Sequence, residues 1–171
     1  DERRDNLIMA VTMSDGLYAW AAIELSTGRF LFNAAPGLPS LLAELHRLRP
    51  AEILLNERLF DEKSFEQKTS AHNKAQHIDF TALEWPGNSQ QQRCPSWHFD
   101  ERSAVENLQR QFAVNQISAL GINPQDCALG ACGAVLQYLK DTQKAALPHL
   151  RLPQREAHDD ALQLDPATRR N

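Results

Sequence analysis

The sequence predicts an α/β fold in which a mixed sheet has helices packed on both faces. Three apolar segments that are separated by turns come first, namely Leu7–Met13, Leu17–Leu25 and Phe30–Phe32. A helical stripe of leucines and a fourth short apolar segment follow them. Because crossover connections between parallel strands are right-handed, this β-β-β-α-β order places the fourth strand parallel to the first and beside it.

Composition narrows the possible functions. The chain has 171 residues, enough for one good core, or for one domain and the start of another. Its net charge of −4 argues against DNA binding by this chain alone, since phosphate contacts depend on Lys and Arg. Three cysteines without C-x-x-C spacing favour a reducing compartment, and no apolar run is long enough to span a membrane. We expect a cytoplasmic protein, and the first residue, Asp1 rather than Met, suggests a fragment.

Two tight turns connect the first three strands into an antiparallel meander. The segments Ser14–Gly16 and Ser26–Gly28 each end in a Gly, which readily adopts the positive φ that such turns require. The second strand is mostly apolar on both faces, and we therefore expect both faces to be covered, as in the middle of a sheet.

The next two elements follow from leucine spacing and from proline. Leucines at steps of three and four predict a helix over Leu38–Leu48, and Pro50 ends it. Glu52–Asn56 is a short apolar segment that we interpret as the fourth strand.

The middle of the chain is more polar. We expect residues 57–74 to be helical in part, Gln76–Trp85 to supply a fifth strand, and Pro86–Ser96 to form an exposed loop. The resulting sheet order, 3-2-1-4-5, is that of a ribonuclease-H-like fold.

Two further helices are predicted in the second half. Asp100 is a suitable N-cap for a helix that reaches about Ala113. Asn123-Pro124, with Asp126 two residues later, predicts the start of a longer helix to about Thr142. The second helix has small residues over one turn, Gly130, Ala131, Gly133 and Ala134, which we expect to permit close approach to the sheet.

The last segments are predicted with simple signals. Leu147–Asp160 contains two prolines and is expected to be an extended connection. Ala161–Leu164 is a candidate strand, and Asp165-Pro166 predicts the start of another helix.

Sequence motifs for catalysis are weak. The chain has no phosphate-binding glycine loop, its six histidines are scattered, and Cys127 and Cys132 are predicted to be buried structural thiols. The alternative function that the topology permits is a metal-dependent nuclease or resolvase of the ribonuclease-H-like class. Such enzymes hold metal ions with carboxylates, one of them within the first strand, whereas Leu7–Met13 has no acid. Glu24 is the candidate metal ligand, and one carboxylate does not make a two-metal site.

The family signal comes from seven stretches taken together. They are ERRDNLIMAV (Glu2–Val11), IELSTGRF (Ile23–Phe30), ELHRLRPAEIL (Glu44–Leu54), WHFD (Trp97–Asp100), LQRQFAV (Leu108–Val114), GAVLQYLKDTQKAALPHL (Gly133–Leu150) and LQLDPATRRN (Leu162–Asn171). In order and spacing they resemble the MutS family of bacterial DNA mismatch repair proteins, whereas residues 57–96 match poorly.

The resemblance implies a division of the chain. Residues 1–158 would be the connector domain, domain II, with a ribonuclease-H-like fold, and residues 159–171 would begin the core and lever domain, domain III. It implies a non-catalytic domain that links mismatch recognition to the ATPase and provides a surface for MutL. The mismatch-reading Phe-x-Glu of the family lies in an earlier domain, so the triplets that begin at Phe60 and Phe99 are interpreted as chance matches.

Partners and cofactors are likewise implied by the resemblance. ATP and Mg²⁺ would bind elsewhere in the parent protein, mismatched DNA would be bound only by the full-length dimer, and this fragment would hold no cofactor. We predict that MutL contacts the solvent face of the helix that follows Asp100, mainly at Glu106, Asn107 and Arg110. The alternative for these three residues is an ordinary solvated helix face.

Overall fold

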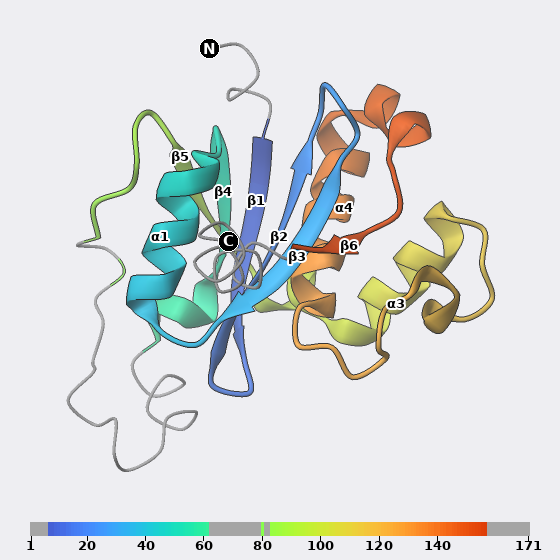
Figure 1. Cartoon of the computed structure of the whole chain (residues 1–171), viewed down its shortest axis with the longest axis horizontal. Helices are drawn as coiled ribbons and strands as arrows, with labels where there is room; N and C mark the ends of the chain where they lie inside the picture. The colour runs from blue at the N-terminus through green and yellow to red at the C-terminus, as the bar shows by residue number, and fades with distance from the viewer. Residues whose placement is uncertain (1–6, 62–79, 81–82, 157–171) are drawn as a thin grey trace, which may run out of the picture.

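The computed structural model describes residues 7–61, 80 and 83–156, and within them one mixed sheet forms the centre of the domain (Figure 1). The strand order is β5-β4-β1-β2-β3-β6. The strands are β1 Leu7–Ser14, β2 Leu17–Glu24, β3 Phe30–Ala35, β4 Glu52–Asn56, β5 Gln90–Cys94 and β6 Gln154–Arg155. β1, β2 and β3 pair antiparallel, whereas β4 is parallel to β1, β5 to β4, and β6 to β3.

Helices cover both faces of this sheet, as the sequence predicts. The α-helices are α1 Leu38–Leu48, α3 Glu101–Gln111 and α4 Leu129–Thr142, and the 3-10 helices are η2 Glu57–Phe60, η5 Ser96–Phe99, η6 Ile117–Leu120 and η7 Lys144–His149. Figure 1 shows α1 on one side of the sheet and α4 on the other. α3 packs against α4 and lies farther from the sheet.

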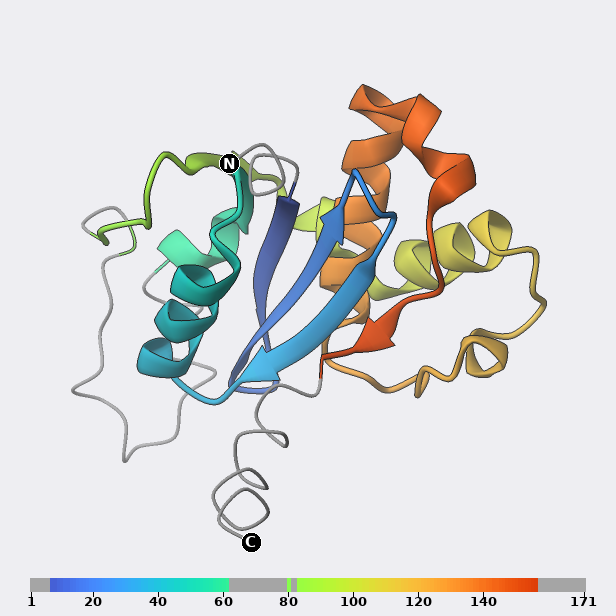
Figure 2. The ribbon, with the colours of Figure 1, turned by 45° about the horizontal axis from the view of Figure 1, so that its top comes forward.

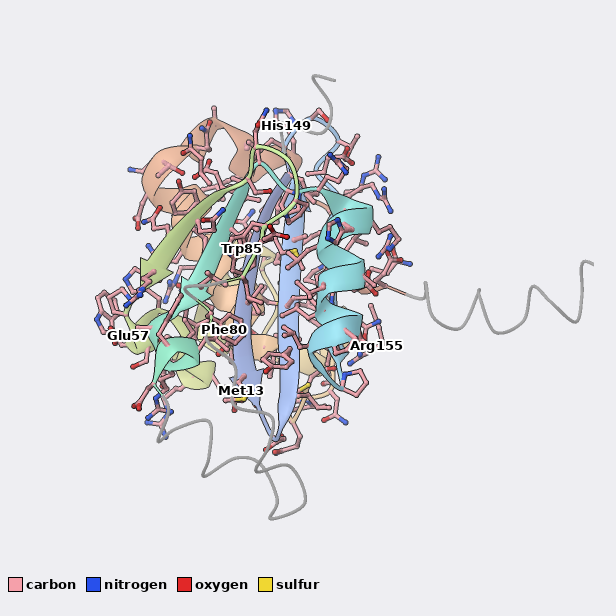
Figure 3. All side chains as sticks on the ribbon, turned by 90° about the vertical axis from the view of Figure 1, so that its left-hand side faces the viewer. Met13, Glu57, Phe80, Trp85, His149 and Arg155 are labelled. Atoms are coloured by element: carbon pink, nitrogen blue, oxygen red, sulfur yellow. The ribbon has the colours of Figure 1, made fainter. Side chains whose placement is uncertain are left out.

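The core has two parts because the side chains of β1 and β2 alternate between the two faces. One face buries Met9, Val11 and Trp20 against Leu41 and Leu45 of α1. Phe80 belongs to the same cluster, where its ring lies 5.9 Å from that of Tyr18 (Figure 3). The opposite face buries alternate residues of the same strands against α4. β2 is therefore covered on both faces, which confirms its predicted place in the middle of the sheet.

Both predicted turns have the backbone that their glycines suggest. Asp15 and Gly16 have φ values of 55° and 79°, the pair of positive angles that defines a type I′ hairpin turn. Gly28 has a φ of 78°, and a Cβ there would lie 2.1 Å from the carbonyl oxygen of His149. Gly28 is thus required both by the turn and by the close approach of η7.

The fifth strand is the main error of the sequence prediction. Within the described residues, Gln76–Trp85 contributes no strand: Phe80 is in a 3-10 turn and residues 83–85 are irregular, whereas 76–79, 81 and 82 lie outside them. β5 forms instead at Gln90–Cys94, inside the predicted loop. Four of its five residues are exposed, so β5 is an edge strand without an apolar face. Its register is set by its pairing with β4. The predicted order 3-2-1-4-5 holds, and β6 is added beside β3.

α3 confirms its predicted cap, whereas α4 begins later than expected. The Asp100 carboxylate accepts a hydrogen bond from the backbone N–H of Ser103 at 2.9 Å, and the helix ends at Gln111. α4 begins at Leu129 and not at Asn123-Pro124. The Asn123 side chain caps a turn at Gln125, and the Asp126 carboxylate accepts from the N–H of Ala128 at 2.9 Å, so these residues form turns before the helix.

The glycines of α4 lie against helices and not against the sheet, where they were predicted to lie. A Cβ on Gly133 would lie 2.4 Å from the Cβ of Ala104 in α3, and a Cβ on Gly130 would lie 2.4 Å from the carbonyl oxygen of Phe99 in η5. The two glycines therefore permit close approach to α3 and η5, and not to the sheet as predicted. Ala131 of α4 is buried in the cluster that includes the sheet residues.

The C-terminal segments are partly described. The predicted extended connection Leu147–Asp160 begins within η7, then runs along the edge of the sheet as β6 (Figure 2). Residues 157–160 and the predicted elements at Ala161–Leu164 and Asp165-Pro166 lie outside the described residues, as does the whole segment 62–74. η2 accounts for the described part of the predicted helical region after Asn56.

Candidate partner-binding site

The site is formed where α3 and α4 pack side by side. Ala104 and Gly133 bring the two helices together, because neither has a side chain beyond Cβ. The polar residues one turn farther along then face one another across the helix pair. Asn107 of α3 donates a hydrogen bond from Nδ2 to Oε1 of Gln137 in α4 at 3.3 Å. The site is thus positioned by close helix packing and not by a loop.

Asn107, a predicted partner-binding residue, is the centre of a polar network. Its Oδ1 accepts hydrogen bonds from Nη1 of Arg110 at 3.1 Å and from Nζ of Lys140 at 3.3 Å. Burial, and then the nearby Arg110 guanidinium, lower the pKa of Lys140. The network extends to Asp141, whose Oδ1 accepts from Nε2 of Gln137 at 3.0 Å. Asn107 is half-buried, so it organises this surface and does not project freely from it.

A groove of about 290 Å³ lies between the two helices and the end of η5. It is lined by Trp97, His98, Ser103, Ala104, Glu106, Asn107, Gly133, Gln137 and Asp141. Of the three residues predicted from sequence, Glu106 and Asn107 line the groove, and Arg110 is connected to it through Asn107. The structure therefore brings the three together on one surface.

Trp97 is the residue of this surface that sequence reasoning missed. Its exposed fraction is 70%, the highest among the large apolar side chains that are exposed in the described ranges. Its ring lies 4.1 Å from that of His98. Exposed tryptophan is unusual in a solvated face and common at the centres of protein interfaces. Its position in the sequence could have indicated an exposed aromatic side chain, because Trp97 lies between polar residues and directly follows a segment predicted to be an exposed loop.

The geometry gives no support to the nuclease alternative. The candidate ligand Glu24 accepts a hydrogen bond from Thr27 Oγ1 at 2.8 Å and lies 4.0 Å from Arg29, so it belongs to the hairpin turn. At the carboxyl ends of the parallel strands β1 and β4, the buried side chains are Thr12 and Asn56, which hydrogen-bond to each other at 2.9 Å. In the described part of the chain, no three His, Cys, Asp or Glu side chains gather to hold a metal ion.

The cysteines behave as ordinary thiols of the interior. Cys94 and Cys132 are buried, and Cys127 is half-buried. Burial is the largest cause of the raised pKa of all three thiols, which keeps them protonated at neutral pH. Buried structural placement is confirmed for Cys132 and is only partial for Cys127.

The two Phe-x-Glu triplets have structural roles in their described residues. Phe99 is buried and Asp100 caps α3, which agrees with an anchoring aromatic followed by a helix-starting acid. Phe60 packs its ring 5.9 Å from that of Phe80, and Asp61 caps the end of η2. Glu62 lies outside the described residues.

Comparison with known families agrees with this architecture. The family model described as MutS domain II matches residues 6–151, which include every strand except β6 and all the described helices. MutS domain II is a non-catalytic domain. No helix in the described ranges is long and apolar enough to cross a membrane. The chain therefore belongs to the MutS domain II family, the connector domains of DNA mismatch repair proteins.

Proposed function

We propose that this domain transmits conformational state between the mismatch-binding and ATPase domains of its parent protein and offers the α3–α4 groove as a docking surface for MutL. The observation that carries the docking half is the exposed Trp97 beside a groove that Glu106 and Asn107 line. In this proposal, ATP, Mg²⁺ and mismatched DNA are bound by other parts of the parent, and the connector corresponds to residues 1–158.

Transmission is supported by the way in which the C-terminal strap, residues 150–156, is attached to the sheet edge (Figure 2). Arg155 forms an ion pair with Asp126 and donates to Asn33 Oδ1 at 2.9 Å. The Glu156 carbonyl accepts from Asn33 Nδ2 at 2.6 Å, and its carboxylate lies 3.2 Å from Arg47. These contacts join the strap to β3, α1 and the turn before α4.

An attached strap has a mechanical consequence. A packed domain moves as a rigid body about hinges where few contacts cross. Because the chain is held to the sheet as far as Glu156, we expect the strap to move with the domain, with no hinge within it. A partner that binds one orientation of this domain then shifts the population of the whole protein toward that orientation.

The docking surface is tested by reversing two charges on α3 together. Glu106→Lys with Arg110→Glu keeps the net charge and should lower the affinity of the chain for the ATPase domain of MutL by about fivefold or more, with a nonhydrolysable ATP analogue present. Glu106 and Arg110 are both exposed, so the melting temperature should change little.

The matched control reverses one acid and one base elsewhere. Glu84→Lys with Arg151→Glu also keeps the net charge, and both side chains are exposed and outside the groove. This control should bind MutL as the natural chain does. Equal affinity of the groove variant and the control variant would contradict docking at α3 and α4.

A further inference from the structure

We propose that the α3–α4 groove accepts a basic side chain of the docked partner, best an arginine, between the carboxylates of Glu106 and Asp141 and against the indole of Trp97. This inference rests on the docking function proposed above and specifies its chemistry. It follows from three separate properties of the groove, namely its size, its charge and its one exposed aromatic ring.

The size of the groove suits one side chain of a partner. Ala104 and Gly133 are part of its lining, and neither has a side chain beyond Cβ that could extend into it. Its volume of about 290 Å³ is small for a drug-sized ligand but sufficient for one side chain of a partner. The groove is not enclosed, so a residue on a protein surface can reach it.

The charge of the groove favours a cation. Its lining includes two carboxylates, Glu106 and Asp141, together with His98, and it includes no Lys or Arg. Arg110 and Lys140 do not line the groove, and each donates a hydrogen bond to Oδ1 of Asn107, which does.

The two carboxylates retain capacity for a further donor. The carboxylate of Glu106 is exposed and makes no hydrogen bond or ion pair with any residue that the structure describes. Asp141 uses one oxygen to accept from Gln137. The planar guanidinium of arginine presents several N–H donors in fixed directions and can donate to two carboxylates at once.

The exposed ring supplies the third contact. Tryptophan is the aromatic side chain that binds cations most strongly through its face. The same chain already uses this contact twice, because Arg93 lies 3.8 Å from the centre of the Phe60 ring and Arg155 lies 5.1 Å from that of Phe32. Trp97 has no Arg or Lys of its own chain over its ring among the described residues.

The groove chemistry is tested first with small probes and the complete chain of 171 residues. N-acetyl-arginine amide is titrated against N-acetyl-citrulline amide, which has nearly the same shape but no charge. The arginine probe should shift the indole N–H signal of Trp97 and protect its fluorescence from iodide quenching. The citrulline probe should produce little of either effect. Equal responses to the two probes, or none to arginine, would overturn the proposal.

The partner complex is tested next with single variants. Glu106→Gln and Asp141→Asn should each lower MutL affinity about two- to fivefold, as for partly exposed ion pairs. Trp97→Ala should lower it more, and Trp97→Phe should have an intermediate effect. Glu84→Gln, which neutralises an exposed acid outside the groove, is the matched control and should leave affinity unchanged.

Failure of this inference can be distinguished from failure of the docking proposal. MutL binding that is sensitive to charge reversal at Glu106 and Arg110, yet insensitive to Asp141→Asn and Trp97→Ala, would retain the docking surface and overturn the arginine site. Selective binding of the arginine probe without any MutL binding would support the groove chemistry and overturn MutL as the partner.

Discussion

Replacing Gly133 by Ala is expected to destabilise the domain, although Ala is the better helix former. The added Cβ would lie 2.4 Å from the Cβ of Ala104 and 2.7 Å from its Cα. Both distances are far below ordinary van der Waals contact, and one of the two atoms belongs to the backbone. α3 must therefore move away from α4 by on the order of 1 Å to restore ordinary contact.

The expected magnitude follows from two opposing effects. Overpacking a well-packed contact costs about 1–3 kcal/mol, whereas exchanging Gly for Ala within a helix recovers up to about 1 kcal/mol. We expect a net loss of about 1 kcal/mol in the free energy of unfolding. Because Glu106 and Asp141 lie on the two helices that separate, the variant should also bind the arginine probe less well.

The assay is urea unfolding followed by circular dichroism, with a double-mutant cycle at the contact. Ala104→Gly alone removes a buried methyl group and should destabilise α3. Combined with Gly133→Ala it removes the closest clash and leaves the contact to the Cα of residue 104 at 2.7 Å, so the rescue should be partial. The double variant should therefore lose about 1 kcal/mol less than the sum of the single variants.

The result that would refute this reasoning is a stabilised Gly133→Ala variant with additive effects in the cycle. That outcome would mean that Gly133 behaves as a helical glycine in open space, where only helix propensity matters. The close contact between α3 and α4 at Gly133, and the groove that depends on this contact, would then be refuted.

Three further predictions concern the strap, the tyrosines and the helix cap. Arg155→Ala should lower the free energy of unfolding by about 1 kcal/mol and speed hydrogen exchange at the Glu156 amide; unchanged exchange would argue against an attached strap. Burial, the largest cause, raises the pKa of Tyr18 and Tyr138 to about 12, with a hydrogen bond to a carboxylate adding to the effect at Tyr138. Both tyrosines ionise near pH 10.0 in the unfolded chain, so the stability that the two neutral hydroxyls contribute is complete below pH 10 and is lost as pH rises toward 12. Tyrosinate absorbance that appears at pH 10 in the folded protein would contradict this. The hydrogen bond from the Ser103 amide holds the pKa of Asp100 below its usual 3.8. The stability that the ionised Asp100 cap contributes is therefore present above pH 3.8 and is lost as pH falls through the lower pKa of the folded state. Asp100→Ala should cost about 1 kcal/mol, and Asp100→Asn should keep most of the cap while removing its pH dependence; equal losses in the two variants would exclude capping as the cause.

The order of the first elements could be predicted because their signals are local. Type I′ turns need residues that tolerate positive φ, which Asp15 and Gly16 supply. The leucine spacing of α1 and the cap at Asp100 depend on neighbours within one or two turns. Such elements have their determinants inside the segment itself, and the structure has them where the sequence predicts them.

β5 and the start of α4 could not be predicted in this way. β5 is polar and exposed, and β4 supplies both its hydrogen-bond partners and its register. Asp126 carries a helix-start signal, but its carboxylate is engaged by Ala128 in a turn and by Arg155 of the strap. In both cases a partner distant in sequence decides the conformation.

The sequence by itself determined the family, the fold class and the helix on which the proposed partner-binding residues lie. Glu106, Asn107 and Arg110 were predicted from resemblance and from their place on a helix face. Only the tertiary structure joined them to Trp97 and to Asp141 of α4, and thereby formed a groove. The physical reason is that a groove is the space left between elements, and this one depends on the close approach of two residues, Ala104 and Gly133, that no local pattern pairs.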